Sequence, residues 1–148
     1  MMAKSAVGKE GPDVIMVDGR HYKRSDVSEQ ALVQITNLHF ADAQLQVLNN
    51  RIALIETARA AYVKVLAQQL PDKTAPGNRK KDVITVDGDR YRLEDFSAPA
   101  RAQLANIQFA DRELERLTNE IAVGQMARAG YAGILAKELK GLKPIKTQ

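Results

Sequence analysis

The stretch DVIMVDGRHY at Asp13–Tyr22 returns as DVITVDGDRY at Asp82–Tyr91, and this repetition decides the fold. A shift of 69 residues aligns Asp13–Leu70 with Asp82–Leu139 without a gap, and about 27 of the 58 aligned positions are identical. A match of this length indicates a tandem duplication. The chain then divides into a flexible leader (1–12), repeat 1 (13–70), a basic linker (71–81), repeat 2 (82–139) and a basic tail (140–148).

Each copy opens with a predicted β-hairpin. An apolar run, Val14–Val17 or Val83–Val86, is followed by an Asp-Gly pair and a second short segment. Asp-Gly between extended segments is typical of a type I′ turn, in which both central residues have positive φ. Backbone groups on the outer side of these strands need partners, so another chain or segment should cover at least one edge. The candidate strand edges are marked by Val14, Val17, Val83 and Val86.

A long helix should follow each hairpin. Ser28 and Ser97 stand where an N-cap is needed, and Pro99 fits only the first turn of a helix. Pro71 is expected to end the first helix, and Gly141 the second. Each helix would run for about 42 residues, or roughly 63 Å at 1.5 Å per residue.

Both helices carry a heptad pattern of apolar residues. The a and d positions are Leu38, Ala41, Leu45, Leu48, Ile52, Ile55, Arg59, Tyr62 and Leu66 in copy 1, and Ile107, Ala110, Leu114, Leu117, Ile121, Gly124, Arg128, Tyr131 and Leu135 in copy 2. The linker is too short to run back along a helix of this length, because eleven residues span at most about 37 Å. The predicted fold is therefore mainly α with two short β-hairpins, its helices paired as an antiparallel coiled coil with pseudo-two-fold symmetry.

An alternative fold has a break near the centre of each helix. Asn49-Asn50 and Thr118-Asn119 are poor residues for a helix interior. A break there would turn each copy into a helical hairpin and gather all the strands at one end. In the unbroken form the antiparallel register places Leu45 near Gly124, Leu38 near Tyr131 and Tyr62 near Ile107.

The same register pairs the two charged residues of the seam. Arg59 falls beside Asp111, and Arg128 falls beside Asp42. The interpretation is a register-setting ion pair in each case, and not a ligand pocket. Replacing Asp111 with Ala is then predicted to cost a few kcal/mol, because Arg59 would stay partly buried without its partner.

Helix 1 also carries a second apolar stripe, which is a candidate interaction face. Its members recur every seven residues away from the seam: Val33, Phe40, Val47, Leu54 and Ala61. A pair of helices has nothing to cover such a stripe, so a larger bundle, self-association or a partner groove should cover it.

The sequence offers little for catalysis or for a bound cofactor or metal. It contains no Cys, and its two His residues, His21 and His39, are not retained in the other copy. Metal binding and a cofactor are not expected, because no ligand spacing and no phosphate-binding or nucleophile motif is present. No small-molecule substrate is expected either.

The composition predicts a soluble protein of the cytoplasm, or of a particle assembled there. The net charge is +4, and most of the excess Lys and Arg lies in the leader, the linker and the tail. No signal peptide and no apolar run of the roughly 18 residues of a membrane span is present. The basic linker and tail suggest a contact with nucleic acid as the alternative function.

The combined pattern resembles a small domain-of-unknown-function family seen in bacteria and phages. The resemblance rests on the V-x-V-D-G-x-x-Y hairpin, the Ser-capped helix, Q-F-A-D-x-E-L and A-R-A-G/A-Y. Members typically hold one such unit, whereas this chain has two, and copy 1 has His39 and Ala43 where copy 2 keeps the more typical Gln108 and Arg112. The resemblance supports the fold and implies no activity.

The leading functional expectation is a non-catalytic assembly or scaffolding protein that acts through helical faces and strand edges. It is expected to form a homo-oligomer or to bind another protein, and a phage or bacterial particle component is one concrete version. No interaction with a membrane is expected.

Overall fold

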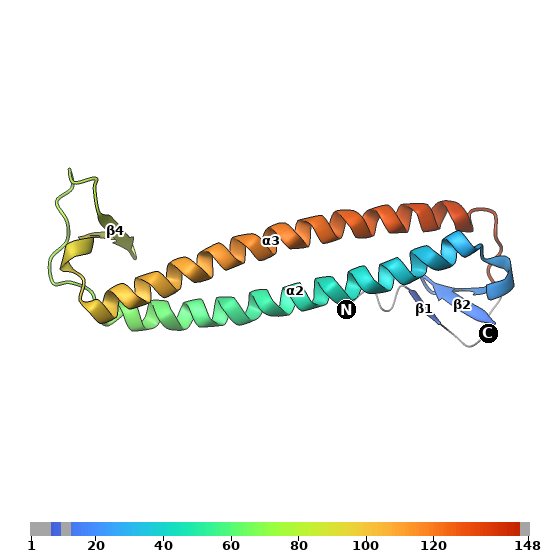
Figure 1. Ribbon diagram of the computed structural model, residues 1–148, viewed down its shortest axis with the longest axis horizontal. Helices are drawn as coiled ribbons and strands as arrows, with labels where there is room; N and C mark the ends of the chain where they lie inside the picture. Colours follow the sequence, from blue (N-terminus) through green and yellow to red (C-terminus); the bar gives the residue numbers. More distant parts are fainter. Residues whose placement is uncertain (1–6, 10–12, 146–148) are drawn as a thin grey trace. The chain divides into compact units, whose positions relative to one another are not determined.

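The computed structural model describes residues 7–9 and 13–145, with side chains described from residue 13 onward. The protein is mainly helical, with two long helices packed together and two small antiparallel hairpins (Figure 1). The helices are α2 (Glu29–Ala67) and α3 (Ala98–Leu139). The strands are β1 (Val7–Lys9), β2 (Val14–Val17), β3 (Arg20–Lys23), β4 (Val83–Val86) and β5 (Asp89–Arg92), and single 3-10 turns, η1 (Arg24–Asp26) and η2 (Leu93–Asp95), follow β3 and β5.

Both predicted hairpins are confirmed. Their strands pair in the register set by a two-residue loop, with Val17 opposite Arg20 and Val86 opposite Asp89. The loop residues have positive φ in both copies, at 50° for Asp18 and 50° for Asp87, and the glycine after each is also positive. Asp tolerates this conformation better than most residues with a Cβ, and Gly adopts it freely, which explains the Asp-Gly sequence.

The helices begin at their predicted caps and continue without a break. The hydroxyl of Ser28 accepts a hydrogen bond from the Ala31 N–H at 3.0 Å, and that of Ser97 accepts one from the Ala100 N–H at 3.2 Å. Helix α2 has 39 residues and α3 has 42, and both are helical through the centre where a break was considered. The broken-helix alternative is therefore wrong.

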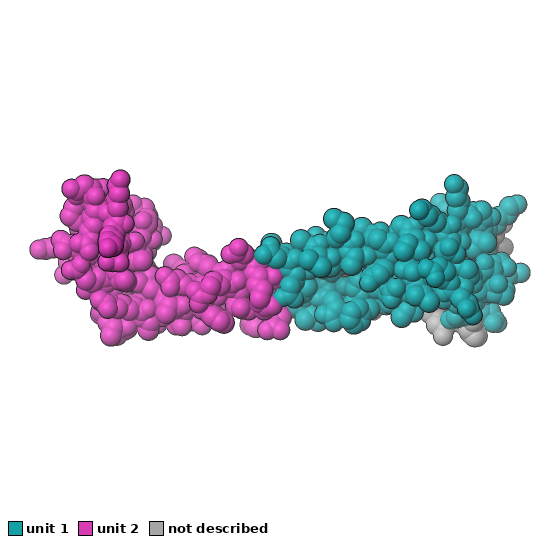
Figure 2. Space-filling model, turned by 45° about the horizontal axis from the view of Figure 1, so that its top comes forward, with its two compact units in different colours: residues 1–50, 118–148 teal, residues 51–117 magenta. Residues whose placement is uncertain are grey.

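The chain forms two compact units, and each combines parts of both sequence copies (Figure 2). Unit 1 comprises residues 1–50 and 118–148, and unit 2 comprises residues 51–117. Unit 1 thus holds the first hairpin, the start of α2 and the end of α3. Unit 2 holds the end of α2, the second hairpin and the start of α3.

Each unit has its own core, in which a hairpin packs against two helix ends. The core of unit 1 consists of Ile15, Val17, Tyr22, Val27, Ala31, Leu38 and Leu135. The core of unit 2 consists of Leu66, Val86, Tyr91, Phe96, Ala100, Leu104 and Ile107. In both units the hairpin covers the start of its own helix and the end of the helix from the other copy. A hairpin with strands of only four residues is marginally stable alone. Burial of this apolar surface against the helices stabilises it.

The leader predicted to be flexible contains a strand, and one residue of the tail forms a β-bridge. Val7–Lys9 forms strand β1, which pairs antiparallel with β2, and the Ile145 N–H donates to the His21 carbonyl at 2.6 Å. These segments are ordered by the first hairpin itself, which offers backbone groups on both edges. The other residues of the leader (1–6 and 10–12) and residues 146–148 lie outside the described part of the chain.

Candidate interaction surfaces

Contacts along the helix pair match the antiparallel register expected from the heptads. In unit 1, a Cβ at Gly124 would lie 3.0 Å from Cδ2 of Leu45, so Leu45 occupies the space that the glycine leaves. Leu38 and Tyr131 belong to the core of the same unit. In unit 2, Tyr62 packs into the core that contains Ile107. Both units therefore show a positions of one helix beside d positions of the other.

In unit 1 an ion pair joins Arg128 of α3 to Asp42 of α2. The Arg128 guanidinium donates two hydrogen bonds to the two carboxylate oxygens of Asp42. The Asp42 side chain is only 9% exposed and that of Arg128 28%. An ion pair with this little solvent is costly to break, because each charge has lost water that only its partner replaces.

The equivalent pair in unit 2 is more exposed. Arg59 Nε donates to Asp111 Oδ1 at 2.5 Å, and Arg59 Nη2 donates to Oδ2 at 3.3 Å. The hydrogen bonds raise the pKa of the Arg59 guanidinium, against a smaller opposing effect of burial. The side chains of Arg59 and Asp111 are 39% and 51% exposed, so solvent screens this pair and its contribution to stability is smaller.

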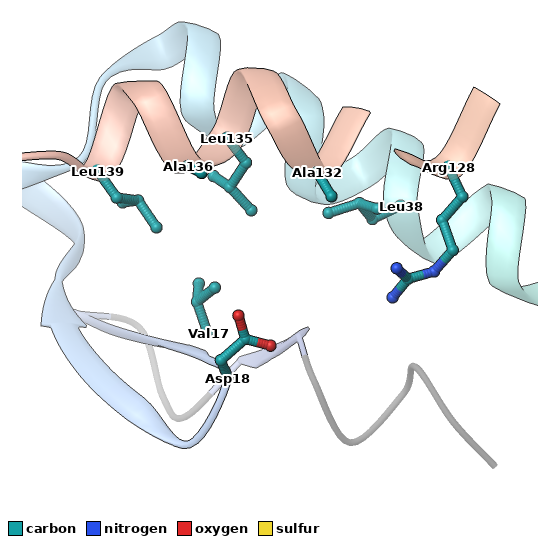
Figure 3. A pocket seen from close by; sticks show the side chains of 8 residues that line it. All are labelled: Val17, Asp18, Leu38, Arg128, Ala132, Leu135, Ala136 and Leu139. Atoms are coloured by element: carbon teal, nitrogen blue, oxygen red, sulfur yellow. The ribbon is translucent and has the colours of Figure 1, made fainter. Parts of the chain in front are cut away.

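A shallow pocket lies beside the ion pair of unit 1, between the first hairpin and the helices (Figure 3). Its volume is about 130 Å³, and Asp18 at the hairpin turn and Arg128 are the charged residues on its walls. The rest of the lining is apolar: Val17, Leu38, Ala132, Leu135, Ala136 and Leu139. Arg128 is hydrogen-bonded to Asp42, and Asp18 of the hairpin turn lines the same pocket.

The exposed large apolar side chains gather on one flank of the helix pair in each unit. With Leu38 at heptad position a, they fall at positions c and g on both helices, except for Met126 at f. We call these residues the apolar flank: Val33, Phe40, Val47, Val123 and Ile134 in unit 1, and Leu54, Val65 and Phe109 in unit 2. Phe40 is 66% exposed and Leu54 71%. These exposed fractions are high for apolar residues of this size. They mark an apolar surface whose contact with water is unfavourable.

Charges in unit 2 support the placement of c and g positions of both helices on one flank. The pKa of Glu113, at a g position of α3, is lowered first by its hydrogen bond from Arg116. It is lowered further by nearby positive charges, among them Arg51 at a g position of α2. The charge of Arg51 acts on Glu113 in this way, as expected for g positions on the same side of the pair.

The predicted interaction face is thus exposed, but it was incomplete. Val33, Phe40, Val47, Leu54 and Ala61 are all exposed on α2. The predicted face did not include Val65 of α2 or Ile134 of α3, nor Phe109 and Val123, which are the copy-2 equivalents of Phe40 and Leu54. Counting g positions together with c positions, on both helices, would have found them. The stripe on helix 1 was only half of the surface.

The candidate strand edges differ between the two hairpins. Strand β2 is covered by β1, and its residues Val14 and Val17 are half-buried and buried. Strand β4 pairs only with β5 among the described residues. Its side chains nevertheless pack toward the core, since Val83 is half-buried and Val86 is buried. The outer edge of β5 meets the linker, where the Ala75 N–H donates to the Arg90 carbonyl at 2.6 Å.

Few groups in the described residues suggest chemistry. No cluster of three or more His, Asp or Glu side chains in residues 13–145 could hold a metal ion. His21 lies in β3 and His39 on α2, on separate elements. No helix within residues 7–9 and 13–145 is both long and apolar enough to cross a membrane.

Neither a protein-family model, nor a curated protein, nor a solved structure matches this chain. The resemblance to a bacterial and phage family of single-unit proteins therefore stays a prediction.

Proposed function

We propose that this protein is a non-catalytic assembly protein that binds a second copy of itself through the apolar flank. The observation that carries the proposal is the exposure of Phe40 at 66% and Leu54 at 71% on a flank that carries exposed apolar side chains in both units. Full burial of one such side chain is worth roughly 1.5–3 kcal/mol, so several of them together can drive association.

The spacing of the flank favours a second copy as the partner. Four of its residues on α2, Val33, Phe40, Val47 and Leu54, recur every seven positions, as the seam within the pair does, so another helix pair of the same spacing can pack against them. The same patch on two identical chains can face itself across a two-fold axis. The proposed product is a bundle of four helices in which the flank becomes a second seam.

The test is the mass of the protein in solution. We expect light scattering after size-exclusion chromatography to give about twice the 16.3 kDa of one chain. At low protein concentration, Phe40→Lys should reduce the mass to that of a single chain, because a lysine ammonium buried in an apolar contact is strongly unfavourable. Val47→Arg should weaken association in the same way, and copy 2 already carries Arg116 at the equivalent helix position.

Ala43→Lys provides the matched control. Ala43 is exposed on α2 at position f, away from both the seam and the flank, and copy 2 has Arg112 there. This variant adds the same charge and should keep the mass of the wild type. Circular dichroism checks that all three variants stay folded. A wild-type chain that is a monomer at every concentration, or equal masses for Phe40→Lys and Ala43→Lys, would contradict the proposal.

The salt dependence separates this function from a contact with nucleic acid. Association through apolar side chains should strengthen or stay constant as salt rises. Binding of DNA or RNA through the basic linker and tail should weaken steeply with salt, because it depends on the release of counterions. Part of the linker charge is already used within unit 2, where Arg79 Nη2 lies 2.9 Å from Glu94 Oε1.

A further inference from the structure

The two hairpins have nearly the same sequence but different neighbours. Strand β1 lies on the outer edge of β2, with Val7 opposite Val17, Gly8 opposite Met16 and Lys9 opposite Ile15. By the shift of 69 residues, the segment of copy 2 that corresponds to β1 is 76–78. That segment takes another position, because the Arg90 guanidinium donates to the carbonyls of Pro76 and Gly77 at 3.2 and 3.0 Å.

The outer edge of β4 is consequently open within the described residues. Val86 and Asp89 flank a two-residue turn, so they form a hydrogen-bonded pair, and the alternation of an antiparallel ladder turns the backbone groups of Val83 and Thr85 outward. No backbone group of residues 7–9 or 13–145 outside this hairpin bonds to either of them. Thr85 is also exposed.

The open edge lacks several of the features that normally prevent strand addition. Val83–Val86 contains no charged residue, no Pro and no bulge, and proteins use these features to protect free edges. The corresponding edge of β2 shows that a strand of this sequence accepts an antiparallel neighbour. The edge of β4 is therefore a site for strand addition.

We propose that the strand added to β4 is the β4 strand of a second copy. Each chain has one β1, and it already covers β2, so β1 cannot cover every edge in an assembly of identical chains. Antiparallel pairing of two β4 strands about a two-fold axis leaves no β4 edge open and joins two hairpins into a four-stranded sheet.

The alternation of the ladder sets the expected register. Ile84 faces Ile84 of the second copy, and Val83 exchanges hydrogen bonds with Thr85 in both directions. This pairing sets Asp82 opposite Val86, so no two acidic side chains face each other directly. Pairing of β4 strands and association through the apolar flank both need a second copy of the chain, but they use separate surfaces.

Amide hydrogen exchange tests the edge directly. Over a hundredfold range of protein concentration, we expect the Thr85 amide to exchange more slowly as concentration rises. The Met16 amide is the internal control, because β1 of the same chain covers it and its exchange should not depend on concentration. Exchange at Thr85 that stays flat over the whole range would overturn the proposal.

A pair of variants at Thr85 isolates the backbone donor. Thr85→Pro removes the outward N–H and leaves the pairing with β5 possible, since Pro is accepted where the N–H faces away from the ladder. The affinity of the β4 strands for each other should fall about tenfold or more, because the symmetric contact loses two hydrogen bonds at roughly 1 kcal/mol each. The readout is concentration-dependent protection of Val83. Thr85→Val keeps the donor and should keep that protection.

Two further variants identify the occupant and separate this inference from the proposed function. Gly8→Pro impairs β1 as a strand donor and should leave the protection of Thr85 unchanged. Loss of protection in this variant would assign the edge to β1 of the second copy and overturn pairing between β4 strands. Phe40→Lys should remove association through the flank but leave protection of Thr85 at high concentration, so each surface can fail without the other.

Discussion

Replacing Asp42 with Ala is expected to lower the free energy of unfolding by about 3 kcal/mol. The substitution leaves the Arg128 guanidinium in a site where its side chain is 28% exposed, with no carboxylate to replace the lost water. Urea unfolding followed by circular dichroism measures the effect. The measurement uses the Phe40→Lys background at low protein concentration, which keeps self-association from adding to the measured stability.

Asp111→Ala is the matched control for Asp42→Ala. It removes the same kind of partner from the equivalent arginine, but Arg59 and Asp111 are 39% and 51% exposed. The expected loss is about 0.5 kcal/mol, as for other solvated ion pairs, so the larger cost predicted from the sequence is revised downward. Arg128→Met combined with Asp42→Ala should recover much of the larger loss, because an apolar side chain suits the site. Equal costs for the two alanine variants would show that burial of the pair is not the cause.

Gly124→Leu is expected to lower the free energy of unfolding by about 2–3 kcal/mol, although Leu is the better helix former. Even the first added carbon would lie 3.0 Å from Cδ2 of Leu45, which is too close for an ordinary contact. The larger side chain must therefore push α2 and α3 apart or force Leu45 into a poor rotamer. Thermal and urea unfolding both report this loss.

Gly133→Leu controls for helix propensity. A Cβ at Gly133 meets nothing within 4 Å, so this variant should gain about 1 kcal/mol from the loss of a helical glycine. Leu45→Ala in the Gly124→Leu background should restore part of the stability, because it returns volume to the same layer. A destabilised Gly133→Leu, or no coupling between positions 45 and 124, would argue against a packing origin.

Regular local signals made the fold predictable. Asp-Gly pairs, capping serines and a sustained heptad each report on a few neighbouring residues, and they agree in both copies. The register followed because Gly124 leaves room for Leu45, and because Arg59 and Arg128 each need a carboxylate on the opposite helix.

Features that depend on distant contacts were not predictable. Val7–Lys9 has only three residues, and it becomes a strand because β2 offers it an edge. The segment after Ala75 lies along β5 through contacts with Arg90, which copy 1 replaces with His21. The different burial of the two ion pairs has no signal in the heptads, since the hairpin turn beside Arg128 contributes to it.

The mixed origin of each unit has a consequence for the ancestry of the chain. Unit 1 needs the start of α2 and the end of α3, and unit 2 needs the reverse, so a chain with one copy would have to recruit a second molecule to complete either. Such an ancestor is an obligate antiparallel homodimer. Fusion through the linker turns that second-order encounter into a first-order folding step. It also frees the two copies from remaining identical, so Ile55 and Gly124 could diverge, as could Val47 and Arg116.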